Sequence, residues 1–214
     1  MLIILNQQST IANQFLFELR DKATQQNRER FRKNMERLGE LMAYEISKKL
    51  EYKEKIVHSP LGTSKIQVPY EQPVLITVLR AGLPYFEGFK NYLNQADCGF
   101  IGAYRKENEK EVSITLDYLA APPLNGRTVI LIDPMLATGK SFVKSVNALA
   151  RLGTPSYIHI AALVAAPEGV EFIKQNLTHP FTIWTWALDE KLNEHAYIVP
   201  GLGDAGDLCF GKKV

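Results

Sequence analysis

The feature that most constrains the fold of this sequence is an alternation of short apolar runs with helical segments, which begins at Pro73. The apolar runs are VLITVL (74–79), CGFIGAY (98–104), TVILID (128–133), YIHIAALVAA (157–166) and FTIWTWAL (181–188). Residues 86–94, 140–151 and 169–176, which lie between them, are predicted to be helices. Runs with apolar residues on both faces predict buried strands, and strands that alternate with helices predict a mainly parallel sheet flanked by helices. Residues 112–119 are predicted to add an antiparallel strand at an edge.

The first third of the chain has a different pattern. Residues 26–50 carry apolar residues at steps of three and four, which predicts a long amphipathic helix with one buried face. These residues are Phe31, Met35, Leu38, Met42 and Ile46. At 214 residues we expect one domain, with a helical segment at about 10–50 and a core at about 70–190. A small hood is expected from about residues 50–70 and 190–214.

Composition excludes several classes of function. The net charge is +2 and the basic residues are spread along the chain, which argues against a nucleic-acid-binding surface. No stretch approaches the ~18 apolar residues that a membrane span needs, and MLIILNQQ lacks the basic leader of a signal peptide. Two cysteines are too few for a disulfide framework. We therefore expect a cytoplasmic protein without a membrane partner.

The segment LIDPMLATGKSF (131–142) predicts a phosphate site. Asp133 ends a predicted strand, and Ala137 to Ser141 begin the next helix, so consecutive backbone N–H groups point at one anion. A carboxylate repels phosphate but accepts hydrogen bonds from a pair of sugar hydroxyls. The pattern therefore predicts a ribose 5-phosphate across the strand end, with the cap of a helix as the alternative.

The same segment also ends like the P-loop of nucleoside triphosphatases. That motif requires a glycine five residues before the Gly-Lys pair, and here the position is Pro134. Because proline has no N–H and a fixed φ, the loop cannot wrap a triphosphate in that way. A nucleoside kinase is therefore disfavoured.

Two further loops have the composition of binding sites. Arg80 opens a turn of small residues directly after the run 74–79, and a guanidinium can bind two oxygens of a diphosphate. Arg105 ends the next strand. The C-terminal segment YIVPGLGDAGD combines apolar anchors with a glycine-rich turn, whose backbone N–H and C=O groups could bind a small flat ring.

The segments DPMLATGKS, LRAGLPYFEG, GAYR, VAAPEG and YIVPGLGDAGD resemble the type I phosphoribosyltransferases and, among them, the uracil phosphoribosyltransferase family. Members of that family carry Asp-Pro where most other type I enzymes have two acids. The resemblance covers about residues 70–214 and is looser before them. At Lys140 the uracil enzymes usually have a second glycine.

The resemblance implies a fold, a reaction and a set of site residues. It implies transfer of the ribosyl group of 5-phospho-α-D-ribose 1-diphosphate (PRPP) to N1 of uracil, with Mg²⁺ held mainly through PRPP and also by Asp204. Arg80, Arg105, Asp133 and Asp204 would be catalytic, and a cis peptide bond without proline is common at the Arg80 loop. PRPP would contact Arg80, Arg105, Asp133, Pro134, Met135, Leu136, Ala137, Thr138, Gly139, Lys140, Ser141 and Asp204. Uracil would contact Ile198, Gly203, Asp204 and Ala205, while Asp207 would hold the shape of the loop.

Relatives in this class are commonly dimers or higher assemblies, so the resemblance implies a homo-oligomer. The alternative function is a regulator of pyrimidine genes built on the same fold, which binds RNA or a nucleotide. Such a regulator needs a basic face, and the densest basic group, residues 28–33, is interrupted by Glu29. Some members carry His-Pro-Leu where this chain has Ser9-Thr10-Ile11, so the sequence supports no expectation about an effector.

Overall fold

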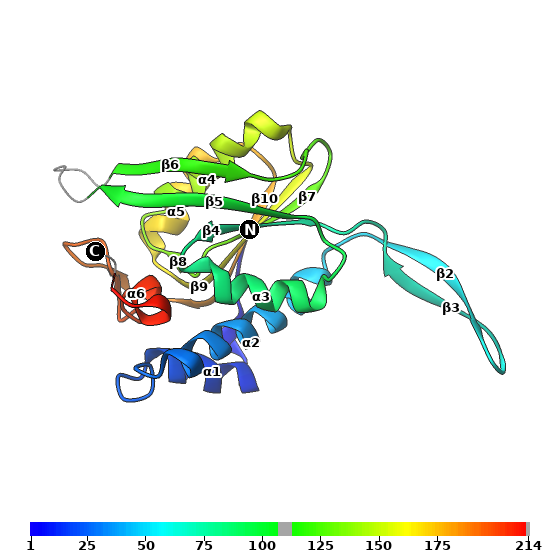
Figure 1. The fold of residues 1–214 in the computed structure, drawn as a ribbon, viewed down its shortest axis with the longest axis horizontal. Coiled ribbons are helices and arrows are strands. Elements are labelled where there is room, and N and C mark those ends of the chain that lie inside the picture. The colour runs from blue at the N-terminus through cyan, green and yellow to red at the C-terminus, as the bar shows by residue number, and fades with distance from the viewer. Residues whose placement is uncertain (107–112, 213–214) are drawn as a thin grey trace.

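A central sheet of eight strands organises the chain in the computed structural model, which describes residues 1–106 and 113–212 (Figure 1). The strand order is β1 (Leu2–Ile4), β10 (Phe181–Leu188), β9 (Tyr157–Ala165), β7 (Thr128–Ile132), β4 (Val74–Leu79), β5 (Cys98–Lys106) and β6 (Ser113–Ala120). The short strand β8 (Met135–Leu136) also pairs with β9. Neighbouring strands are parallel except β5 and β6, so the predicted parallel sheet and its antiparallel edge strand are confirmed.

Helices cover both faces of the sheet. Helices α1 (Ile11–Arg20), α2 (Arg28–Ser47) and α3 (Gly82–Tyr92) pack on one face, and α4 (Lys140–Leu149) and α5 (Pro167–Asn176) on the other. Along β7, Ile130 and Ile132 are buried with the first group while Val129 and Leu131 are buried with the second. This alternation is why the strand is apolar at every position.

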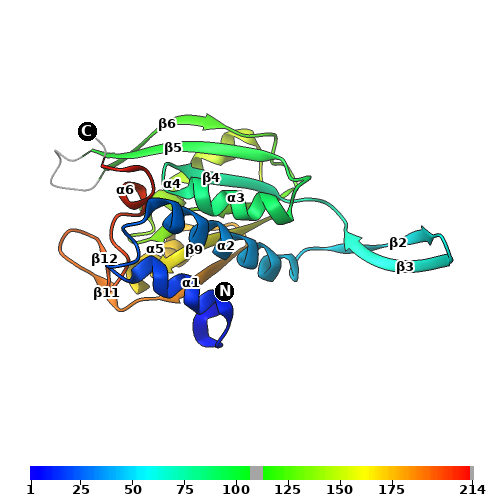
Figure 2. The same ribbon diagram turned by 60° about the horizontal axis from the view of Figure 1, so that its bottom comes forward.

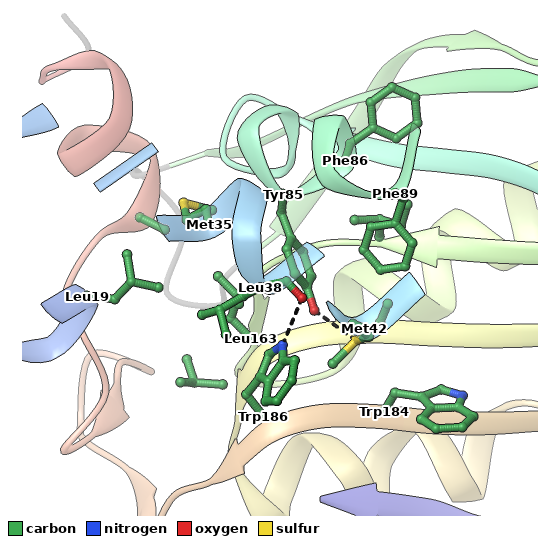
Figure 3. Close-up of a cluster of buried hydrophobic side chains, with 14 of the residues drawn as sticks. Leu19, Met35, Leu38, Met42, Tyr85, Phe86, Phe89, Leu163, Trp184 and Trp186 are labelled. Carbon is green, nitrogen blue, oxygen red and sulfur yellow. Dashed lines mark hydrogen bonds between the residues drawn. The ribbon is translucent and has the colours of Figure 1, made fainter. Parts of the chain in front are cut away.

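The N-terminal helices are joined to the sheet by a close-packed core. The predicted stripe on α2 is confirmed, because its five apolar residues are at most 1% exposed. In Figure 3 the Tyr85 hydroxyl of α3 donates to Met42 Sδ at 2.8 Å, and the Trp186 indole N–H of β10 donates to the Leu38 carbonyl at 3.2 Å. Apolar burial and these two bonds thus tie α2 to both α3 and the sheet.

Two glycines face each other where α2 crosses α3. A Cβ on Gly39 would overlap the Tyr85 carbonyl, and one on Gly88 would overlap the Glu36 carbonyl. The two helix backbones therefore touch without side chains between them.

The predicted hood requires a correction. Residues 52–69 form a hairpin of β2 (Tyr52–Ser59) and β3 (Gly62–Pro69), and it projects from the body at the end opposite the C-terminal segment (Figures 1 and 2). Most of its residues are exposed and none is buried. The prediction that residues 50–70 share a hood with residues 190–214 is therefore wrong.

The C-terminal segment does cover one end of the sheet. It forms a small hairpin of β11 (Lys191–Leu192) and β12 (Ile198–Val199), followed by α6 (Ala205–Phe210), which packs against α2. Among the described residues, no helix is both long and apolar enough to cross a membrane.

Candidate active site

The two main predicted loops follow neighbouring strands. Strands β4 and β7 are parallel partners, with Thr77 opposite Ile132, and the Thr77 hydroxyl donates to the Ile132 carbonyl at 3.2 Å. Arg80 comes three residues after Thr77, and Asp133 comes directly after Ile132. The carboxyl ends of parallel strands share one edge of a sheet. The loop that begins at Arg80 (the arginine loop) and the loop that begins at Asp133 (the aspartate loop) therefore emerge side by side.

The arginine loop is narrow and packs against the strands behind it. The Leu79–Arg80 peptide bond is cis, as the resemblance implied. A Cβ on Gly82 would overlap Thr77 Oγ1, so only glycine lets α3 begin this close to β4. The loop is therefore positioned by backbone contact, while the Arg80 side chain remains 44% exposed and can meet a ligand.

The Arg80 guanidinium points toward the C-terminal helix. Its Nη2 lies 3.4 Å from Asp207 Oδ1 and 3.5 Å from the Gly211 carbonyl oxygen. A Cβ on Gly206 would be 3.8 Å from the same nitrogen. The structure thus brings α6 and the arginine loop together, although they are far apart in the sequence.

Hydrogen bonds to the backbone fix the conformation of the aspartate loop. Asp133 is half-buried, and its Oδ1 accepts a hydrogen bond from the Met135 N–H at 3.1 Å. The Pro134 carbonyl accepts from the amides of Leu163 and Val164, and the following two residues form β8. These bonds hold the chain that leads from the carboxylate to the predicted phosphate turn.

The phosphate turn rests on the start of α5. Gly139 has φ +74°, and a Cβ there would lie 2.6 Å from the Gly169 carbonyl oxygen. A Cβ on Gly169 would in turn overlap the Ala137 carbonyl. Helix α4 begins at Lys140, so the first-turn amides have no partner within the helix and are available to an anion. The Lys140 amide is 3.4 Å from Thr138 Oγ1.

The third predicted element, residues 198–205, runs from β12 through a turn to the first residue of α6, and we refer to it as the 198–205 turn. Ile198 and Ala205 are buried, while Gly203 is exposed with φ +93°. Asp204 caps α6, because its Oδ1 accepts from the Asp207 N–H at 2.9 Å. The expected shape-holding role of Asp207 thus includes two contacts, one with Asp204 and one with Arg80.

The structure places most of the predicted site residues at this edge of the sheet. Arg105 belongs to β5, next to β4, but its side chain lies outside the described part of the structure. Sequence reasoning missed Thr77 and Gly169, which support the loops from behind. Thr77 lies in no motif, and Gly169 ends the segment VAAPEG without a predicted role, since each residue matters only through a neighbour that is distant in the sequence.

The residues at this site fit a metal ion that binds together with the substrate. Within residues 1–106 and 113–212, no three His, Cys, Asp or Glu side chains gather closely enough to hold a metal ion. Asp204 offers a carboxylate at the start of α6, and Asp207 on the same helix contacts Arg80. Mg²⁺ commonly binds through one or two carboxylates together with substrate phosphates and water, so this donor set suits it.

Comparisons with known proteins agree with this geometry. A family model described as uracil phosphoribosyltransferase matches residues 6–212. The chain is 44% identical over 213 residues to the uracil phosphoribosyltransferase of Porphyromonas gingivalis, and the match covers 99% of each chain. It is 40% identical over 202 residues to that of Dictyoglomus turgidum, covering 92% of this chain and 94% of the relative. A solved structure of a protein from Aquifex aeolicus has a TM-score of 0.88 at 30% identity and covers 100% of each chain.

A mainly parallel sheet whose strand ends carry an arginine loop beside an acidic, phosphate-type loop is the architecture of the type I phosphoribosyltransferases. Within that class, full-length similarity to the named relatives narrows the assignment. The chain belongs to the uracil phosphoribosyltransferase family.

Proposed function

We propose that this protein transfers the 5-phosphoribosyl group of PRPP to N1 of uracil, which yields UMP and diphosphate. The observation that carries the proposal is the family match over residues 6–212, because it spans the arginine loop, the phosphate turn and the 198–205 turn together. The reaction salvages a free pyrimidine base. Nothing in the fold or the comparisons favours the alternative of an RNA-binding regulator.

The two loops on β4 and β7 would hold PRPP by its two ends. The amides of the turn from Ala137 to Ser141 bind the 5-phosphate, and Asp133 accepts hydrogen bonds from the ribose hydroxyls. Arg80 binds the diphosphate together with Arg105. Contacts from Pro134, Met135 and Leu136 would be made by the backbone that joins Asp133 to the turn. The anomeric carbon C1′ then lies between the loops.

Catalysis would depend on charge stabilisation more than on a nucleophile of the protein. As the C1′–O bond to diphosphate breaks, positive charge develops on the sugar and negative charge on the leaving group. Arg80 and Arg105 stabilise the leaving group, while Asp133 and Asp204 favour the cationic sugar. Uracil N1 forms the new bond to C1′ and gives up its proton to the departing diphosphate or to water.

The base would be read by the backbone of the 198–205 turn. Apart from the reacting N1, uracil presents the carbonyl oxygens O2 and O4 and the N3–H group. These need two hydrogen-bond donors and one acceptor. The resemblance assigns these contacts to Ile198, Gly203, Asp204 and Ala205. Cytosine reverses the polarity at one edge, and an unpaired buried group costs about 1–3 kcal/mol.

Mg²⁺ would be held mainly through PRPP, with Asp204 as the protein ligand. When bound, it neutralises diphosphate charge and so makes this group easier to expel. Omission of Mg²⁺ with added chelator is expected to abolish UMP formation.

A base-competition assay tests the function directly. The protein is mixed with PRPP, Mg²⁺ and one radiolabelled base, and the nucleotide product is separated and counted. We expect product from uracil and at most about a hundredth as much from cytosine, given the cost of a mispaired edge. Equal or greater product from hypoxanthine or orotate, or none from uracil, would refute the proposal.

The role of Arg80 gives a second test. Arg80→Ala is expected to lower kcat/KM for PRPP by about 100-fold or more, since a charge-assisted contact to the leaving group is lost. Lys33→Ala, which removes an exposed cation on α2, serves as the control and should leave kcat/KM unchanged. Near-native activity of Arg80→Ala would remove the arginine from the diphosphate site.

We also propose that the protein is a homo-oligomer, and the β2–β3 hairpin supports this. Ile56 is 62% exposed, Ile66 is 53% exposed and Leu61 is fully exposed. An isolated two-stranded hairpin is marginal in water, so a partner surface would stabilise it. A location in the cytoplasm, expected from the sequence, remains a prediction that cell fractionation would test.

A further inference from the structure

An ion pair outside the proposed contact residues links the first helix to the C-terminal segment. Arg20 is the last residue of α1, and Asp189 directly follows β10. Their side chains form a two-pronged contact, with Nη1 2.9 Å from Oδ2 and Nη2 2.8 Å from Oδ1. The side chain of Asp189 is only 6% exposed and that of Arg20 only 21%. A pair that is this buried and planar has a fixed geometry.

The pair also binds both polar groups of one backbone residue. The Gly201 N–H donates to Asp189 Oδ2 at 2.9 Å, and the Gly201 carbonyl accepts from Arg20 Nη1 at 3.2 Å. Gly201 has φ +58°, and a Cβ there would overlap the Ile198 carbonyl. Two charged side chains and a left-handed glycine therefore determine the course of the chain at this residue.

Gly201 lies in the middle of the 198–205 turn. On its N-terminal side, β12 pairs with β11, and the Glu190 N–H donates to the Val199 carbonyl at 3.0 Å. On its C-terminal side, Leu202 is buried and the exposed Gly203 follows. Figure 2 shows α1 on the same side of the molecule as β11 and β12. The Arg20–Asp189 pair thus holds the centre of the turn against a helix from the other end of the sequence.

We propose that Arg20 and Asp189 are positioning residues for base recognition, which act by fixing the 198–205 turn through Gly201. The inference rests on the proposed function, since it concerns how that site reads uracil. Neither residue needs to touch the base. They set where the donors and acceptors of the turn lie, and hydrogen-bond readout fails when such groups move by a fraction of an ångström.

A purely structural role is the competing explanation, and the chain contains a matched control for it. Glu18, on the same helix α1, forms a similar pair with Arg30: Arg30 Nε is 2.8 Å from Oε2 and Nη2 is 2.6 Å from Oε1. The Glu18 side chain is 9% exposed. This pair joins α1 to α2, and Glu18 also accepts hydrogen bonds from Gln14 and Asn34, which lie on the same two helices and not in the 198–205 turn.

The experiment compares Arg20→Lys with Arg30→Lys. Lysine keeps the charge but loses the two-pronged geometry, so both variants are expected to lower the melting temperature. Only Arg20→Lys should raise KM for uracil, by about tenfold or more, because base readout depends on sub-ångström placement. It should raise KM for PRPP less than KM for uracil, because Asp204 is the one residue of the turn proposed to contact PRPP, and it should narrow the preference for uracil over cytosine. Equal effects of the two variants on KM for uracil would overturn the proposal.

A second pair of variants covers the case in which Arg20→Lys does not fold. Asp189→Asn and Glu18→Gln each neutralise a buried carboxylate with little change of shape. The proposal requires a larger rise in KM for uracil from Asp189→Asn than from Glu18→Gln. A similar rise in both, or none in either, would overturn it.

Hydrogen exchange separates failure of this inference from failure of the proposed function. Amides of residues 198–205 should exchange faster in Arg20→Lys than in Arg30→Lys, whether or not the protein makes UMP. If exchange is faster but wild-type protein makes no UMP, the proposed function is wrong and the positioning of the turn stands. If exchange is unchanged while the wild type is active, the positioning role is wrong.

Discussion

His159 on β9 shows how one side chain can make stability depend on pH. The residue is 3% exposed, and its Nδ1 accepts a hydrogen bond from the Trp184 indole N–H at 3.1 Å. Burial lowers the pKa of this imidazole from 6.5 to about 4. The folded protein therefore holds a neutral histidine in a range where the unfolded chain binds a proton.

The direction of the pH effect follows from that difference. Above pH 6.5 the histidine is neutral in both states and has no effect. As the pH falls from about 6.5 to about 4, unfolding becomes more favourable, by up to about 3 kcal/mol, and no further loss comes below that range. His159→Asn places an acceptor near the position of Nδ1 without a titrating group. Thermal unfolding at several pH values should show a smaller loss for the variant in this window, and equal losses would contradict the assignment.

Gly169 on α5 matters through what lies against it. A methyl group at this position would overlap the Ala137 carbonyl and push the phosphate turn away from its place. Gly169→Ala is therefore expected to raise KM for PRPP about tenfold or more, although the residue contacts no substrate in the proposed mode.

Steady-state kinetics with PRPP varied at saturating uracil would measure this effect. Lys174→Ala is the control, because it removes an exposed side chain of the same helix that pairs with Glu171, also on α5. An unchanged KM in Gly169→Ala would show that the turn tolerates displacement and is less rigid than its packing indicates.

At the level of elements, the β2–β3 hairpin makes a separable contribution. Lys53 and Val68 are register partners, so residues 54–67 can be replaced by Asn-Gly, which suits a two-residue hairpin turn. The shortened protein should keep its circular dichroism spectrum, because the hairpin contributes no buried residue to the core. Light scattering should show a smaller assembly than the wild type. A wild type that is already monomeric would refute the proposed oligomer.

Elements with local signals were predicted from the sequence, and those that depend on distant partners were not. The strand before Asp133 and the helix after it could be predicted, because apolar residues, a charge and small polar residues occur in order over 15 positions. The hairpin at 52–69 was not predicted because neither of its faces is buried. In β2 the residues Ile56 and Val57 are adjacent among charged residues, so this segment lacks the alternation of a packed strand. Strand β1 has only three residues and depends on β10.

The features of the candidate site also fall into those that the sequence predicts and those that it does not. Loops on single strand ends, such as those at Arg80 and Asp133, could be proposed from composition. The contact between Arg80 and Asp207 joins residues 127 positions apart, and that between Arg20 and Asp189 joins residues 169 positions apart. No periodicity or motif reports such pairs, since they arise only when the sheet brings both segments together.

For the whole molecule, the N-terminal helices are part of the fold that holds the site. Every proposed substrate contact lies after residue 70, yet the face of the sheet beneath α2 consists of large apolar residues that the helix covers. Residues 70–214 expressed alone are therefore expected to aggregate or to form a loosely packed state, because that face would meet water. A soluble fragment with sharp thermal unfolding would contradict this expectation.

The facing glycines at residues 39 and 88 restrict how sequences of relatives can be recombined. Where two backbones touch directly, a β-carbon from either parent at either position forces the helices apart, and the displacement passes to the arginine loop at the start of α3. Chimeras that take α2 and α3 from one parent should keep this contact. Those that break between the two helices will succeed only when the parent that supplies α2 has glycine at position 39 and the parent that supplies α3 has glycine at position 88.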